Sequence, residues 1–228
     1  MVICVGSRLA FAAAIWSQIV LAAPGLPTPT SPADGGWCAR TCSLNWHFAP
    51  VLQTVGTEVQ VFDDQGVLVG STFDTLTSPP DDNWTTPKLP DAGFFTWQVR
   101  GRDDAGVTSS WSAPWLFKVD GEAPLAPATV TASLDGGWLR LVSAPLTDSQ
   151  SGFAVYHFGF SRIDELDGGL TFNTSSFTQK QSGPRRDTWL GPGTWLAGVH
   201  GHDKVDNPGL TTLAGPFVHV GADRAARR

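Results

Sequence analysis

The feature that most constrains the fold of this chain is a strand–turn–strand pattern that occurs twice, over residues 93–120 and again over 193–220. In the first copy, apolar and polar residues alternate from Phe95 to Arg102, a period of two that is typical of a β-strand with one buried face. A turn follows in the run D-D-A-G at 103–106, because aspartates bond their own backbone and glycine tolerates positive φ. The pattern therefore predicts a β-hairpin.

The second copy lies 100 residues downstream without a gap. Identical residues occupy matching positions in the two strands: Val99 and Val199, Gly101 and Gly201, Asp103 and Asp203. The run D-G-G-W also occurs twice, at 34–37 and at 135–138, an offset of 101. Two landmarks at nearly the same offset indicate the duplication of one unit. A unit of this length with short strands and many turns is typical of a β-sandwich, so we expect an all-β chain of two tandem antiparallel β-sandwiches.

The first residues predict an export signal. Arg8 precedes a largely apolar stretch from Leu9 to Leu21, and the run V-L-A at 20–22 resembles a signal cleavage site. This stretch is shorter than the roughly 20 residues that a membrane helix needs. We therefore expect a secreted protein, extracellular or at the cell surface, without a stable membrane span.

Composition favours a turn-rich protein that does not bind nucleic acid. Charged residues make up 16% of the chain, which carries 25 glycines, 17 prolines and a net charge of −6. Basic residues cluster only at the C-terminus, which argues against a nucleic-acid partner. The expected segments are a signal peptide (1–23), a Pro/Thr/Ser-rich spacer (24–33), the first sandwich (34–120), a proline-stiffened linker (121–128), the second sandwich (129–222) and a basic tail (223–228).

Cys38 and Cys42 are the cysteines left after removal of the signal. On one straight strand their Cα atoms would lie outside the window of about 4.4–6.8 Å that a disulfide requires. In the second copy, however, D-G-G-W leads directly into the next strand, whereas in the first copy residues 38–43 intervene. The two ends of such an insertion return to neighbouring points, so we predict a Cys38–Cys42 disulfide worth about 2 kcal/mol. Free thiols are unfavourable after export, and metal ligation lacks a second ligand pair.

Further short motifs fall in the first unit: Leu44-x-Trp46, Leu89 before Gly93-Phe94-Phe95, Val99-x-Gly101-x-Asp103-x-Ala105-Gly106, Ser110-Trp111-Ser112, and the run from Val119 to Pro124. Together they resemble the fibronectin type III and related immunoglobulin-like modules of bacterial extracellular proteins. The resemblance extends over residues 30–221 and implies tandem sandwich modules. It does not identify a ligand, because one fold serves many functions.

His200 and His202 occupy alternate positions on the outward side of a predicted strand, where the first copy has arginines. Two histidines need a third ligand to hold a metal ion, and the sequence places neither His157 nor His219 beside them. We therefore expect a solvent-facing pair, with no metal and no cofactor. The aspartates that follow each strand could ligate calcium, but turn formation explains them better.

Tryptophan is more plentiful than two small cores require, with 10 in the chain. Exposed aromatic side chains could stack on sugar rings or fill a pocket of a partner, whereas packing at strand edges and in loops is the plainer explanation. The surplus tryptophans include Trp84, Trp111, Trp115 and Trp189. Arg100 is expected to stack on Trp111 across the hairpin, worth about 0.5–1 kcal/mol. The candidate ligand face comprises Arg100, Arg102, Trp111, Trp115, His200 and His202.

No catalytic motif is present in the sequence. It contains neither a G-x-S-x-G nucleophile motif nor a phosphate-binding glycine loop, and its three glutamates form no paired-carboxylate pattern. We therefore expect a non-catalytic binding or spacer protein that recognises a surface protein or a polysaccharide. Two alternatives stay open: a small secreted hydrolase with a site built from loops, and an adhesin- or fimbria-like subunit with an unpaired strand groove.

Overall fold

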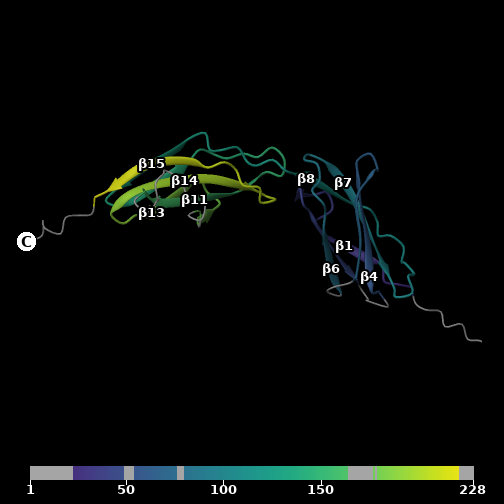
Figure 1. Cartoon of the computed structure of the whole chain (residues 1–228). Coiled ribbons are helices and arrows are strands. Elements are labelled where there is room, and N and C mark those ends of the chain that lie inside the picture. Colours follow the sequence, from purple (N-terminus) through teal and green to yellow (C-terminus); the bar gives the residue numbers. More distant parts are fainter. Residues whose placement is uncertain (1–22, 49–53, 76–79, 164–176, 178, 221–228) are drawn as a thin grey trace, which may run out of the picture.

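The computed structural model describes residues 23–48, 54–75, 80–163, 177 and 179–220, which form β-strands and connecting loops in two units placed end to end (Figure 1). The expected signal peptide, apart from its last residue, and the expected basic tail lie outside these residues. Within the described ranges, no helix has the length and apolar character needed to cross a bilayer. The expectation of an all-β chain is confirmed for the part of the protein that the structure describes.

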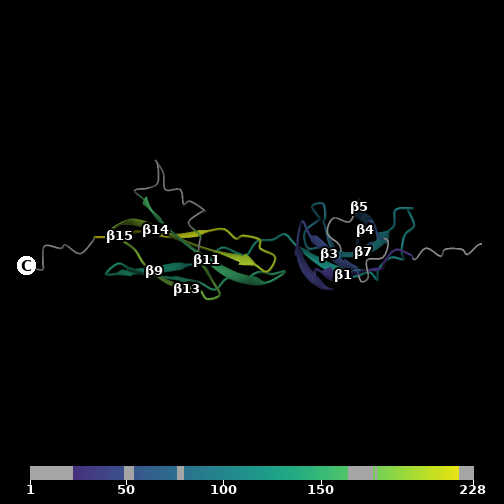
Figure 2. The ribbon, with the colours of Figure 1, turned by 90° about the horizontal axis from the view of Figure 1, so that it is seen from below.

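The first unit is a sandwich of two sheets, seen edge-on in Figure 2 with β1 and β3 in one layer and β4 and β5 in the other. Its strands are β1 (Pro27–Ser31), β2 (Gly36–Ala39), β3 (Ser43–Phe48), β4 (Gly56–Asp63), β5 (Leu68–Thr75), β6 (Asp81–Thr85), β7 (Phe94–Arg102) and β8 (Trp115–Asp120). One sheet has the order β1-β3-β6, and the other has the order β2-β8-β7-β4-β5.

Within the described residues, the second unit repeats this arrangement without an equivalent of β2. Its strands are β9 (Val130–Asp135), β10 (Trp138–Ser143), β11 (Phe153–Arg162), β12 (Gln179–Gln181), β13 (Arg185–Trp189), β14 (Gly193–Asp203) and β15 (Thr212–His219). The sheets have the orders β13-β10-β9 and β12-β11-β14-β15. In both units the repeated strand lies centrally: β7 between β8 and β4, and β14 between β15 and β11.

The repeated hairpin lies in equivalent surroundings in the two units. Along β7, the inward residues Phe95, Trp97 and Val99 are buried, and the residues between them are partly exposed. After each strand an isolated bridge closes the turn, between positions 102 and 108 in the first unit and between 202 and 208 in the second. The offset of 100 residues inferred from the sequence therefore holds in three dimensions.

Each unit has its own hydrophobic core between its two sheets. Trp46 and Trp97 meet in the first core, with ring centroids 6.2 Å apart. Leu139, Phe158 and Val199 are fully buried in the second core. Alternation of inward apolar and outward polar residues along the strands produces both cores.

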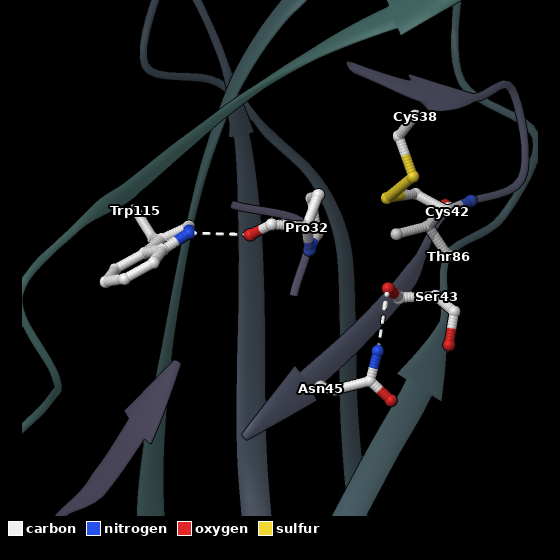
Figure 3. Close-up of a disulfide and its surroundings, with 7 residues drawn as sticks. All are labelled: Pro32, Cys38, Cys42, Ser43, Asn45, Thr86 and Trp115. Carbon is white, nitrogen blue, oxygen red and sulfur yellow. Dashed lines mark hydrogen bonds between the residues drawn. A yellow bond between two sulfur atoms is a disulfide. The ribbon is translucent and has the colours of Figure 1, made fainter. Parts of the chain in front are cut away.

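The predicted disulfide is present between Cys38 and Cys42, whose Cα atoms are 5.5 Å apart (Figure 3). Cys42 is fully buried, and its backbone N–H donates to Thr86 Oγ1 at 3.0 Å. The inserted segment does more than form a loop, however. Its first two residues, 38 and 39, belong to the short strand β2, which pairs with β8 in parallel, so this edge departs from the antiparallel pairing that we expected. The reason is that the chain crosses from one sheet to the other here, whereas in the second unit D-G-G-W forms the turn between β9 and β10.

The segment between the two units is held by hydrogen bonds as well as by its prolines. The Asp120 carboxylate, at the end of β8, accepts from Glu122 N at 3.0 Å and from Ser151 N at 2.9 Å. From the second unit, Asn207 Nδ2 donates to the backbone oxygens of Asp120 and Glu122, both at 3.1 Å. Because Ser151 and Asn207 belong to loops of the second unit, the last strand of the first unit is attached directly to the second.

Candidate functional site

Three of the six residues predicted as a ligand face gather on the outer surface of the first unit. The Arg100 guanidinium lies 4.4 Å from the centre of the Trp111 ring, which confirms the expected stacking, and its Nε donates to Glu58 Oε2 at 2.8 Å. On the same strand, Arg102 lies 4.7 Å from the ring centre of Phe73. These contacts occupy both arginine side chains.

Trp115 does not lie on this surface. It pairs with Trp97 across the hairpin, on the inward phase of the strands, and packs against the first core. Its Nε1–H donates to Pro32 O at 2.8 Å (Figure 3). Trp84 is also partly buried and packs against the first core, so both of these indoles contribute to the packing of the fold.

The most exposed indoles lie on the second unit instead. Trp138 on β10 and Trp189 on β13 are register partners, with exposed fractions of 58% and 53% and ring centroids 5.6 Å apart. We call the outer surface of the β13-β10-β9 sheet the tryptophan face; its members are Ser133, Asp135, Trp138, Arg140, Asp187 and Trp189. A hollow of about 400 Å³ opens on this face between β9, β10 and β13. The sequence singled out Trp189 as surplus, but it did not pair it with Trp138.

Charged groups border the exposed rings of the tryptophan face. Asp187 accepts hydrogen bonds from Arg185 and from Arg140, whose Nε lies 3.4 Å from Oδ1. The hydrogen bond from Arg185 lowers the pKa of Asp187 and keeps this carboxylate ionised. The face therefore combines flat apolar surface with fixed donors and acceptors.

The two histidines predicted on the outward side of β14 lie beside a third one. His157 on β11 is the register partner of His200, and one ring nitrogen from each of His157, His200 and His202 lies within 4.8 Å of the others. The Nε2 atoms of His200 and His202 are 3.3 Å apart, and the rings of His157 and His202 stack with centroids 4.1 Å apart. We call these three residues the histidine cluster. The sequence could not reveal it because β11 and β14 are distant along the chain.

The Nδ1 atoms of His200 and His202 have hydrogen-bond partners, whereas His157 Nε2 has none in the part of the chain that the structure describes. His202 Nδ1 lies 2.6 Å from Asp206 Oδ1, and His200 Nδ1 lies 3.3 Å from Thr211 Oγ1. His157 is only 5% exposed, and its Nε2 has no hydrogen-bond partner among the described residues.

Burial keeps two of these imidazoles neutral. Desolvation, with added repulsion from His157 and His202, lowers the pKa of His200 to about 4. Desolvation also lowers the pKa of His157, with a further contribution from His202. Near neutral pH, each of these rings therefore carries one N–H and one nitrogen lone pair.

Three carboxylates, those of Asp120, Asp148 and Asp203, also lie within 4.8 Å of one another at the junction of the units. Backbone donors occupy them: Asp148 Oδ1 accepts from residues 150 and 152, and Asp203 Oδ1 accepts from residues 205 and 207. Burial raises the pKa of Asp203. These hydrogen bonds stabilise turns, which is the role that the sequence predicted for such aspartates.

Comparison with known proteins identifies the fold but no sequence relative. No family model and no curated protein sequence matches the chain. Among solved structures, the FN1–FN3 domains of chicken CNTN1 superpose with a TM-score of 0.56 at 13% identity, covering 84% of this chain and 67% of that one. The fibronectin(III)-like modules of Clostridium thermocellum CbhA give 0.45 at 15% identity, covering 82% and 91%. Domains A168–A170 of titin give 0.42 at 12% identity, covering 83% and 66%.

The first of these superpositions covers 84% of this chain. At 13% identity it establishes the fold alone. The chain therefore has the fold of tandem fibronectin type III-like and immunoglobulin-like modules, as the motifs of its first unit predict.

Proposed function

We propose that this chain is a secreted, non-catalytic binding and spacer protein that recognises a polysaccharide through the tryptophan face of its second unit. One observation carries the proposal: Trp138 and Trp189 lie side by side with more than half of each side chain exposed. Indoles are among the side chains that folding buries most, and neighbouring exposed apolar groups on a soluble protein typically mark a binding surface.

The chemistry of the face fits a sugar better than a purely apolar ligand. A pyranose ring offers C–H groups on its faces, which pack against indole rings, and hydroxyls at its edge, which need donors and acceptors. Asp187 and Asp135 provide acceptors, and Arg140 provides donors beside the rings. The hollow of about 400 Å³ falls within the usual size of small-ligand pockets, about 300–1,000 Å³.

The spacer part of the proposal rests on the junction. Hydrogen bonds from Ser151 and Asn207 hold the end of β8 and the start of the linker against the second unit. A joint fixed in this way keeps the two units extended, so that a ligand on one unit stays at a defined distance from the other. The apolar N-terminal stretch of the sequence and the Cys38–Cys42 disulfide support secretion, because disulfides persist in oxidising compartments.

Affinity electrophoresis of the full chain in gels that contain defined soluble polysaccharides, together with pull-downs on insoluble ones, tests the proposal. We expect retardation by at least one polysaccharide, and a loss of affinity of about tenfold or more in Trp138→Ala or Trp189→Ala, the range for central binding residues. Trp111→Ala is the matched control, since it removes an indole from the first unit and should leave binding intact.

Three results would count against the proposal. If the double variant Trp138→Ala/Trp189→Ala binds polysaccharide as tightly as the wild type, the tryptophan face is not the binding site. If the chain captures a surface protein and binds no polysaccharide, the ligand is a protein and not a sugar. Release of reducing ends from the bound polysaccharide would show that the protein is a hydrolase.

A further inference from the structure

We propose that the histidine cluster of the second unit is a binding site for a divalent transition-metal ion, Zn²⁺ or Cu²⁺, held by His157, His200 and His202. Imidazole nitrogen is a preferred ligand of both ions. The site lies on the β12-β11-β14-β15 sheet, whereas the tryptophan face lies on the β13-β10-β9 sheet. The two proposals are therefore independent.

The spacing of the nitrogens fits metal coordination. In a tetrahedral zinc site with Zn–N distances of about 2.0–2.1 Å, two ligand nitrogens lie about 3.3 Å apart. The Nε2 atoms of His200 and His202 are 3.3 Å apart. One ring nitrogen from each of the three histidines lies within 4.8 Å of the others. Closer approach of the His157 ring would complete the set of three ligands.

The unpartnered nitrogen of His157 supports the same conclusion. Buried polar atoms in folded proteins nearly always have a partner, and one that lacks it needs an explanation such as a bound ion. His157 Nε2 is buried and has no hydrogen-bond partner within the described residues. A cation at the centre of the cluster would occupy a lone pair of this ring.

Asp206 and Thr211 contact the Nδ1 atoms of His202 and His200, as the groups that orient metal-bound histidines do. Asp206 accepts from His202 Nδ1–H, which leaves the Nε2 lone pair of His202 directed toward His200. The Thr211 hydroxyl can take the same role for His200 Nδ1, since a hydroxyl accepts as well as donates. The Asp206 carboxylate also offsets positive charge from an ion and from Lys180, the register partner of His157.

Three protein ligands leave one coordination position free, and His200 and His202 are both partly exposed, so solvent reaches the site. The first unit provides a built-in comparison. By register, Glu58 and Arg100 on β4 and β7 match His157 and His200 on β11 and β14, and Arg102 matches His202. The same sheet positions therefore hold an ion pair in one unit and convergent imidazoles in the other.

Equilibrium dialysis of the full chain, purified without a polyhistidine tag and stripped with a chelator, tests the site with Zn²⁺ and Cu²⁺ in separate arms. We expect one tightly bound equivalent of at least one ion, which is lost in His202→Ala and in His157→Gln. Asp206→Asn should weaken binding about 10–100-fold, the usual effect of removing a group that orients a ligand. His47→Gln and His219→Gln are matched controls that remove histidines outside the cluster and should keep the equivalent.

Circular dichroism establishes that each variant is folded. If His157→Gln fails to fold, His202→Ala decides, because His202 is more exposed than His157. Absence of a bound equivalent in both arms would overturn the proposal, and so would an equivalent that persists in His202→Ala.

Discussion

The two units of this protein have the same strand order around their central hairpin but use the outer surface of that hairpin differently. In the first unit, Glu58 pairs with Arg100, which stacks on Trp111. In the second unit, the matching register positions bring His157 beside His200. The inward residues, such as Val99 and Val199, are alike because both sandwiches must fill a core. The outward-facing residues do not fill a core, so they can differ between the units, and they give each unit its own surface chemistry.

The units also differ at one edge of the larger sheet. In the first unit, β2 pairs with β8 and is tied by the Cys38–Cys42 disulfide. In the described part of the second unit, β15 stands at the edge of its sheet. β2 therefore pairs with a strand edge in one copy, whereas within the described residues of the other copy no strand is hydrogen-bonded to the matching edge of β15.

The largest expected effect comes from breaking one core and leaving the other intact. Trp97→Ala should destabilise the first unit by about 3–5 kcal/mol, because it leaves a large cavity in a closely packed core. Phe158→Ala is the matched change in the second unit. Hydrogen exchange measured by mass spectrometry should show faster exchange mainly in β3, β4, β7 and β8 for the first variant, and mainly in β10, β11 and β14 for the second. Equal loss of protection throughout both units in either variant would show that the cores do not act separately.

A smaller effect should follow from exchanging the outward residues between the copies. The triple variant His157→Glu/His200→Arg/His202→Arg gives the second unit the residues of the first. Because an ion bound only to the folded state stabilises it, Zn²⁺ or Cu²⁺ at about 100 times its dissociation constant should stabilise the wild-type second unit by about 2.7 kcal/mol, and this gain should vanish in the variant. Urea unfolding with and without the ion measures it. An undiminished gain in the folded variant would contradict the assignment of the ligands.

Removal of the disulfide should affect the first unit alone. The double variant Cys38→Ser/Cys42→Ser is expected to lose about 2 kcal/mol, because the unfolded chain regains the entropy that the closed loop removes. Chemical denaturation followed by tryptophan fluorescence would measure the loss. Reduction of the wild type by dithiothreitol should reproduce it, and no change in stability in either experiment would show that β2 holds its place without the crosslink.

The smallest effect concerns the stacked arginine of the first unit. Arg100→Lys keeps the positive charge beside Glu58 but loses the flat contact with Trp111, so it should cost about 0.5–1 kcal/mol. Arg140→Lys, which changes an arginine paired with Asp187 in the second unit, serves as the comparison. A larger loss in the second variant than in the first would contradict the importance of the Arg100 stack.

The sequence by itself determined the repeated unit, the phase of its central strand and the disulfide. Alternation along Phe95 to Arg102 reveals which side chains face inward, since this property depends only on neighbours in the chain. The same local information placed Arg100 on Trp111, because both residues belong to one hairpin. It could not place Trp115 correctly, since the inward phase of β8 depends on its pairing with β7.

Only the tertiary structure decided which distant side chains meet. His157 lies beside His200, and Trp138 beside Trp189, through the register of strands that are far apart in the sequence. Register between such strands is set by how both sheets close over a shared core, and a shift of one residue would turn each side chain to the opposite face. The pairing of β2 with the edge of β8 has the same origin, because the arrangement of the two sheets places that edge beside β2.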